Sequence, residues 1–147
     1  MGELDVRRVY IRVLPHEINK IEISEKGFEV IFKLTYKGVY LKVNRVRMAG
    51  KVKELHDFRK FIEIMIIDDE GNARVRAWNN VANKLRSFPI DNCIEVFGRI
   101  GSFRDETYIA ADFFRTISDA EFNSYRDLIG KDRDLILRFK KINLEGK

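Results

Sequence analysis

Two arginines and a tryptophan alternate along one short stretch of the chain. Arg74, Arg76 and Trp78 stand at every second position, and small or branched apolar residues stand between them. A period of two is typical of a β-strand with one buried face, so the two guanidinium groups and the indole would share the other face. Guanidinium groups neutralise phosphates, and aromatic rings stack on bases for about 1–3 kcal/mol per base with little regard to sequence. The stretch therefore suits contact with a single-stranded nucleic acid.

Two turn-like segments carry the same combination of aromatic and basic side chains. They supply Phe58, Arg59 and Lys60 in one loop, and Phe103 and Arg104 in the turn of a hairpin. Basic charge is also concentrated nearby, because residues 40–60 hold seven basic and two acidic side chains, an excess equal to the chain's net charge of +5. Such an excess, which includes Arg45 and Arg47, suits a polyanion, but a solvated strand face explains it equally well.

The segments that would position these side chains form five strands with one helix between the third and the fourth. We expect strands at residues 39–55, 61–67, 73–78, 93–100 and 107–117, and a helix at residues 81–88 that Asn79 or Asn80 caps and Pro89 ends. Gly50 would let the long first strand bend and serve both sides of a barrel. This order is that of the OB fold, whose second and third strands and whose loops 1–2 and 4–5 face the ligand.

We expect the N-terminal third, residues 1–39, to form an extension packed on the barrel. Residues 7–14 and 28–34 alternate and are strand-like, whereas residues 17–24 fit a strand or a helical turn. No motif in this part indicates a chemical activity.

The aromatic candidates also have structural interpretations. Trp78 could close the rim of the barrel instead of stacking on a base, and Phe58 fits packing as well as exposure. Phe103 has little core within reach of a hairpin tip, so we expect it to be exposed. The two arginines of the third strand could instead pair across strands with an acidic side chain; the candidates are Glu63, Asp69 and Glu70.

Residues 118–142 predict one long amphipathic helix. Ser118 and Glu121 form a capping box at its start. Its apolar stripe, which we predict to be a subunit interface, consists of Phe122, Tyr125, Leu128, Ile129, Leu135, Ile136, Phe139 and Ile142. A helix of about 25 residues is roughly 37 Å long, more than a small barrel easily covers. Part of the stripe should therefore meet another chain; the alternative is a helix folded back over the N-terminal extension.

Several classes of protein are disfavoured. The sequence has no phosphate-binding glycine loop, no glycine-flanked nucleophile and no plausible pair of His and Cys, so we expect no enzyme, no cofactor and no metal. Asp68 and Asp69 are better explained as turn formers before Gly71. The single Cys93 excludes an intrachain disulfide. No apolar run is long enough to span a membrane and no signal peptide opens the chain, so we expect a soluble, intracellular protein of the cytoplasm or nucleoid with no membrane partner.

Four pieces together resemble the middle-sized subunit of replication protein A, archaeal replication-protein-A subunits and the related small telomere-capping subunits. They are VNRVRMAGKVKEL, IIDDEGNARVRAW, VFGRIGSFRDETYIAADFFRTIS and the helix that follows, and the resemblance covers roughly residues 7–142. It implies single-stranded DNA binding in replication, repair and recombination, with stacking by Trp78 and Phe103. It also implies that the C-terminal helix joins helices of two other subunits in a three-helix bundle. Many members carry a winged-helix domain after this helix; this sequence ends at Lys147, so the recruitment role tied to that domain is not expected.

The sequence thus predicts a mainly β protein with an N-terminal strand extension (1–39), a single five-stranded OB-fold barrel (40–117) and an assembly helix (118–147). Its predicted function is that of a non-catalytic, sequence-independent single-stranded DNA-binding subunit of a replication-protein-A-like hetero-oligomer. The rival functions are a structural subunit with little DNA binding and an RNA-binding accessory module. The predicted DNA contacts are Trp78, Phe103, Arg74, Arg76, Arg104, Phe58, Arg59, Lys60, Arg45 and Arg47.

Overall fold

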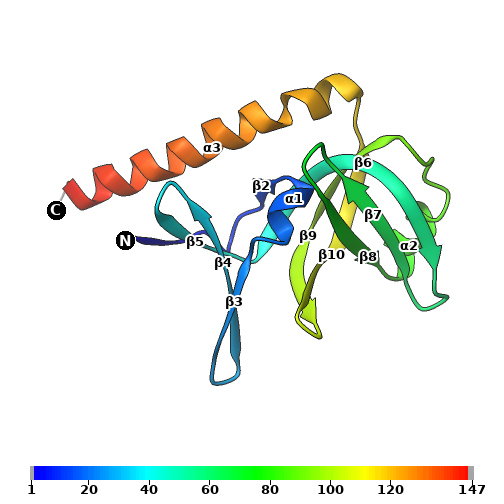
Figure 1. Ribbon diagram of the computed structural model, residues 1–147, viewed down its shortest axis with the longest axis horizontal. Coiled ribbons are helices and arrows are strands. Elements are labelled where there is room, and N and C mark those ends of the chain that lie inside the picture. Colours follow the sequence, from blue (N-terminus) through cyan, green and yellow to red (C-terminus); the bar gives the residue numbers. More distant parts are fainter. Residues whose placement is uncertain (1, 146–147) are drawn as a thin grey trace.

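A closed five-stranded barrel forms the body of the computed structural model, which describes residues 2–145 and the side chains as far as Phe139 (Figure 1). Its strands are β6 (Arg45–Asp57), β7 (Ile62–Ile67), β8 (Asn72–Ala77), β9 (Cys93–Phe103) and β10 (Glu106–Thr116). They are bonded in the order β6-β7-β8-β10-β9, and β9 pairs again with β6. Helix α2 (Asn79–Leu85) lies between β8 and β9 in the chain. The predicted OB fold is therefore confirmed.

The long strand β6 closes the barrel by serving two neighbours. Its first half pairs with β9 as far as Lys51, and its second half pairs with β7 from Lys51 onward. Gly50 stands at the changeover, where a Cβ atom would lie 2.2 Å from Ile66 Cγ2 and 2.8 Å from the Ile67 carbonyl oxygen. Only glycine allows so close an approach, and the predicted bend at Gly50 is confirmed.

Alternating side chains fill the barrel. On β8 the small and branched residues point inward and the two arginines outward, as the period of two predicted. On β7, whose faces the sequence could not tell apart, Ile62, Ile64 and Ile66 are fully buried. Burying each such side chain contributes about 1.5–3 kcal/mol, so the inward face fixes the register of the strands that carry the candidate site.

The N-terminal part forms a second, four-stranded sheet in the order β1-β5-β4-β3. Its strands are β1 (Glu3–Asp5), β3 (Glu22–Lys26), β4 (Glu29–Tyr36) and β5 (Val39–Val43), and the ambiguous residues 17–24 divide between α1 (Pro15–Ile18) and β3. Strand β2 (Ile11–Val13) instead pairs with β6 of the barrel.

The predicted first barrel strand at residues 39–55 was wrong in one respect. The strand breaks at Asn44, and β5 belongs to the N-terminal sheet, so the barrel begins at Arg45. The two-residue turn Lys37–Gly38, with φ of 48° and 77°, folds β5 back onto β4 and commits it to that sheet.

The C-terminal helix α3 (Asp119–Glu145) begins beside the barrel and runs over the N-terminal sheet (Figure 1). Its predicted capping box is present, because the Glu121 amide donates to Ser118 Oγ at 3.1 Å. The predicted side-chain cap on α2 is not, since Trp78 occupies that position and its side chain makes no capping bond. Within residues 2–145, no helix is both long enough and apolar enough to span a bilayer.

Candidate nucleic-acid interface

A row of aromatic rings crosses the barrel from the loop between β6 and β7 to the end of β8. Phe58 and Phe61 have ring centroids 5.1 Å apart, and Phe61 and Trp78 are 5.7 Å apart. Phe58 is 52% exposed and Trp78 is 38% exposed. The loop that carries Phe58 is a tight turn, in which the Phe58 amide donates to the Phe61 carbonyl at 3.0 Å. The row is therefore held in place while its outer faces remain open to solvent.

The two arginines of β8 share a single acidic partner. Arg74 Nη1 donates to Glu63 Oε1 at 3.1 Å, and Arg76 Nε donates to Glu63 Oε2 at 3.0 Å. Glu63 lies on the outer side of β7, directly opposite Arg76 in register, and is only 7% exposed. Cross-strand pairing with Glu63, one of the alternatives open from the sequence, is thus what the structure contains. The carboxylate orients both guanidinium groups and neutralises one of their two charges.

Arg76 links the aromatic row to β10. Its guanidinium carbon lies 5.2 Å from the centroid of Phe61 and 4.6 Å from that of Tyr108. A guanidinium held between two rings is pre-organised, so it loses little freedom when it binds an anion. Tyr108 in turn packs over Gly101, where a Cβ atom would lie 2.6 Å from its ring.

The hairpin between β9 and β10 supplies the other end of the surface. Phe103 is 57% exposed, as predicted, and the Arg104 guanidinium lies 5.2 Å from its ring. The turn residues Arg104 and Asp105 both have positive φ, at 52° and 66°, which gives a two-residue turn that holds Phe103 at the tip. We call the surface formed by Phe58, Phe61, Arg74, Arg76, Trp78, Phe103, Arg104 and Tyr108 the open face.

The predicted basic residues do not all reach this face. Arg59 and Lys60 are exposed in the loop beside Phe58. Arg47 instead donates two hydrogen bonds to Glu95, at 2.9 and 3.1 Å, and Arg45 pairs in register with Arg99 of β9. The bend of β6 is the reason, because the half that carries Arg45 and Arg47 lies against β9 rather than β7. The basic excess of residues 40–60 is therefore divided between two sides of the barrel.

Two members of the open face, Phe61 and Tyr108, were not predicted. Phe61 opens an almost wholly apolar run, so no alternation distinguished its exposed ring from the buried residues that follow. Tyr108 sits in the closing strand, whose pairing with β8 brings it beside Arg76. The tertiary pairing of parallel strands leaves no local signal in the sequence.

A second carboxylate, Glu95, holds the start of α3 on the opposite side of the barrel. It is fully buried and accepts bonds from Arg47, from Arg115 Nε at 2.7 Å and from the Tyr125 hydroxyl at 2.8 Å. Burial alone would raise the pKa of Glu95, but these hydrogen bonds outweigh it and hold the pKa below its ordinary value. Next to it, burial and then a hydrogen bond to Asp119 raise the pKa of Cys93 to about 11, so this thiol is unreactive.

The predicted interface stripe of α3 divides into two parts. Tyr125 and Ile129 are buried against the barrel with Leu14, Ala49 and Cys93, and Phe122 and Ile136 are partly buried against the same chain. For these residues the prediction needs correction, because the helix folds back over the barrel and the N-terminal extension. Leu128, Leu135 and Phe139 remain exposed, at 37%, 64% and 66%, and Ile142 lies outside the described side chains.

Charged contacts fasten the helix to the N-terminal part. Arg133, which is 4% exposed, bonds Glu17 at 2.6 and 2.9 Å and the Arg12 carbonyl at 3.0 Å. Asp134 accepts from the Tyr36 hydroxyl at 2.8 Å and from Lys37 at 2.9 Å. A buried ion pair of this kind fixes one position of the helix, because an alternative would leave charges buried without partners.

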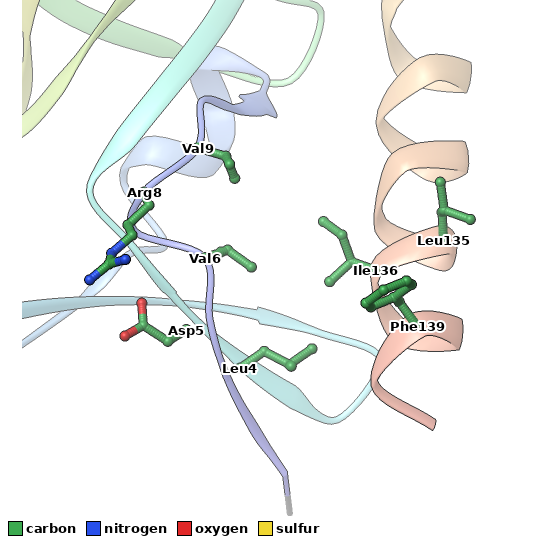
Figure 2. A pocket seen from close by; sticks show the side chains of 8 residues that line it. All are labelled: Leu4, Asp5, Val6, Arg8, Val9, Leu135, Ile136 and Phe139. Atoms are coloured by element: carbon green, nitrogen blue, oxygen red, sulfur yellow. The ribbon is translucent and has the colours of Figure 1, made fainter. Parts of the chain in front are cut away.

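Beyond these contacts, the end of α3 borders an apolar groove of about 630 Å³. Leu4, Val6 and Val9 of the N-terminal segment face Ile136 and Phe139 across it (Figure 2), and Leu135 also lines the groove. Among the described residues, no three side chains of His, Cys, Asp or Glu are placed to hold a metal ion.

Comparison with known proteins places this architecture in a class. No family model matches the sequence. Replication factor A protein 2 of Schizosaccharomyces pombe is 29% identical over 79 residues, which are 54% of this chain and 28% of that protein. An uncharacterized 18.7 kDa protein in a ribosomal RNA operon of Thermofilum pendens is 22% identical over 133 residues, covering 88% of this chain and 77% of that protein. The match to the Schizosaccharomyces protein thus spans less than a third of its length.

Two solved structures share the fold over most of both chains. A chain of the S. pombe Stn1–Ten1 complex matches with a TM-score of 0.64 and 20% identity. The match covers 90% of this chain and 94% of that chain. A chain of a replication protein A heterotrimer bound to single-stranded DNA matches with a TM-score of 0.65 and 16% identity. The match covers 86% of this chain and 97% of that chain. The chain therefore has the fold of an OB-fold subunit with a C-terminal helix. More particularly, it shares its fold with a chain of the replication protein A heterotrimer, so the predicted resemblance is confirmed at the level of the fold. None of these proteins is named as an enzyme.

Proposed function

We propose that this chain binds single-stranded DNA without sequence preference, as a non-catalytic subunit of a hetero-oligomer that acts in DNA replication, repair and recombination. One observation carries the proposal: the partly exposed row Phe58–Phe61–Trp78, with Arg76 held beside it. Such a row offers successive bases a stacking surface and their phosphates a pre-organised cation. The complexes that share the fold, one of them bound to single-stranded DNA, support it.

The test is equilibrium binding of a fluorescent oligo-dT to the isolated chain, measured by anisotropy at two salt concentrations. Wild-type protein should bind, and its affinity should fall as salt rises. The double variant Trp78→Ala, Phe103→Ala should lose on the order of 2–4 kcal/mol, as two lost base stacks would.

A matched control is Phe28→Ala, which removes a fully exposed ring at the tip of the β3–β4 hairpin, outside the open face. It should bind like the wild type. Absence of binding at low salt by a folded wild-type chain would reject the proposal and favour the rival function, a structural subunit. A clear preference for oligo-U over oligo-dT would favour the RNA-binding module instead.

We also propose that the exposed end of the α3 stripe packs against helices of two other subunits, in a three-helix bundle. Leu135 and Phe139 border the apolar groove in Figure 2, a surface that a soluble chain ordinarily covers. The chain should co-elute on a sizing column with purified replication-protein-A-like subunits of the same organism. Leu135→Glu with Phe139→Glu should abolish co-elution, whereas Arg138→Glu, at an exposed position of the same helix, should not.

A further inference from the structure

A second group of aromatic rings lies on the outer surface of β9 and β10, away from both hydrophobic cores. Phe97 and Phe113 are register partners whose rings are stacked, with centroids 4.5 Å apart and planes at 15°. Tyr10 meets both rings edge-on, at 5.5 and 6.0 Å. Phe113 is 49% exposed, and none of the three rings belongs to a buried core cluster of the described residues. Core packing therefore does not explain this cluster.

Arginines surround the rings, and acidic side chains do not balance all of their positive charges. The Arg47 guanidinium lies 4.7 Å from the centroid of Phe97, but Glu95 neutralises its charge. Arg45 and Arg99 stand directly opposite one another on β6 and β9, and both are exposed. Like charges in such a pair repel each other and destabilise the pairing of the two strands.

Only part of this repulsion is relieved within the described residues. Arg99 has a long contact of 3.4 Å with Asp112, which also accepts a bond from the Tyr10 hydroxyl. Arg45 donates at 3.2 Å to the Arg8 carbonyl, a neutral acceptor that leaves its charge in place. A phosphate between Arg45 and Arg99 would offset the repulsion, and Phe113 lies one outward position further along to receive a base.

This cluster continues the open face along the sheet. Phe103 and Phe97 project from the same side of β9, six residues or about 20 Å apart. Between them the outward positions are Gly101, covered by Tyr108, and Arg99. Aromatic, cationic and aromatic groups therefore follow one another along the strand. OB folds occupy about 4–16 nucleotides, so one bound strand can contact both the open face and this cluster.

We propose that the outer surface of β9 and β10 is a second contact site for single-stranded nucleic acid, which a strand reaches after passing Phe103. Phe113 stacks on a base, and Arg45 and Arg99 bind the adjacent phosphate. This proposal rests on the proposed function, since it extends the same bound strand. It predicts that long oligonucleotides use a surface that short ones do not reach.

The experiment compares oligo-dT of about 6 and about 25 nucleotides, each titrated with the full chain at low salt. Phe113→Ala should lower the affinity for the long oligonucleotide about tenfold, which is within the range for one lost base stack. It should leave the affinity for the short oligonucleotide unchanged. Trp78→Ala should lower the affinity for both lengths, and Phe28→Ala should lower the affinity for neither. Arg45→Gln with Arg99→Gln should lower the salt dependence for the long oligonucleotide only.

The outcomes separate the two proposals. If Phe113→Ala and the arginine double variant bind both lengths like the wild type while Trp78→Ala is defective, the second site is rejected and the proposed function stands. Such a result would favour a protein occupant for this cluster. If wild-type protein binds neither length, both proposals fail. The arginine variant alters only exposed side chains, so it tests the second site even where Phe113→Ala lowers the melting temperature.

Discussion

The same local arrangement occurs on two sides of the barrel, and one of the two also binds the C-terminal helix. On each side a glutamate of a barrel strand binds two arginines beside an aromatic ring. On the open face this glutamate is Glu63, with Arg74, Arg76 and Phe61; on the other side it is Glu95, with Arg47, Arg115 and Phe97. Both glutamates are buried, and the difference is that the Tyr125 hydroxyl of α3 also donates to Glu95, at 2.8 Å. The Glu95 cluster therefore fastens a helix, whereas the Glu63 cluster lies on the open face, where the proposed function places the bound strand.

Removal of the Glu95 carboxylate should have the largest effect of any single substitution in the two clusters. Glu95→Ala leaves Arg47 partly buried without its partner and the Tyr125 hydroxyl without its acceptor. Loss of one member of a buried ion pair typically costs about 3–5 kcal/mol. Urea unfolding should show this loss in the free energy of unfolding. Glu63→Ala is the matched change on the open face and should cost clearly less, since the bonds described for Glu63 come from Arg74 and Arg76 and not from a buried hydroxyl of a helix. Equal losses would contradict the comparison.

The acid side of the stability profile should sharpen the same contrast. The pKa of Glu95 in the folded state lies below its ordinary value of 4.5, so the unfolded chain binds this proton more readily. The stability that ionised Glu95 contributes is present above about pH 4.5 and is lost as the pH falls through the lower, folded-state pKa. Glu95→Gln should therefore flatten the decline in the free energy of unfolding below pH 4.5. If the variant's stability declines as steeply as that of the wild type, other carboxylates cause the decline. One such group is Asp68, whose pKa is also lowered.

On the open face, loss of an aromatic surface should reduce binding at least as much as stability. Phe61→Leu keeps an apolar side chain under Trp78 but removes the ring that contacts both Trp78 and Arg76. Affinity for oligo-dT should fall by roughly 1 kcal/mol, and the free energy of unfolding by about 1 kcal/mol or less. Anisotropy and urea unfolding measure the two effects separately. Unchanged affinity would show that Phe61 only supports the barrel.

The contrast between the two faces also marks how far the sequence can predict this protein. Alternation on β8, the bend at Gly50 and the exposed Phe103 are local signals, and each was correctly predicted. The stripe of α3 specified which face of the helix is apolar, but not that Tyr125 and Ile129 would lie on the chain's own barrel. Periodicity identifies a buried face without identifying what covers it.

Ion pairing was the least predictable feature, because it depends on neighbours from distant strands. Arg47 and Arg76 both alternate with apolar residues and look alike in the sequence. The bend of β6 places Arg47 beside Glu95, and the β7–β8 register places Arg76 beside Glu63. Only the closed barrel shows which acidic partner each arginine has, and hence which of the two lies on the open face.

The smallest expected effect tests whether the cations of the open face meet phosphates. Glu63→Gln removes one negative charge between Arg74 and Arg76 but keeps a hydrogen-bond acceptor in place. Both arginines then present their full charge, so oligo-dT should bind up to about 1 kcal/mol more tightly at low salt, and the slope of log affinity against log salt should steepen by up to about 1. Glu22→Gln, a matched change of an exposed glutamate in the N-terminal sheet, should shift both quantities much less. If Glu63→Gln leaves the slope unchanged, Arg74 and Arg76 do not contact the phosphates. The phosphate contacts of the open face would then fall to Arg104 and to the neighbouring loop residues Arg59 and Lys60, which Glu63 does not neutralise.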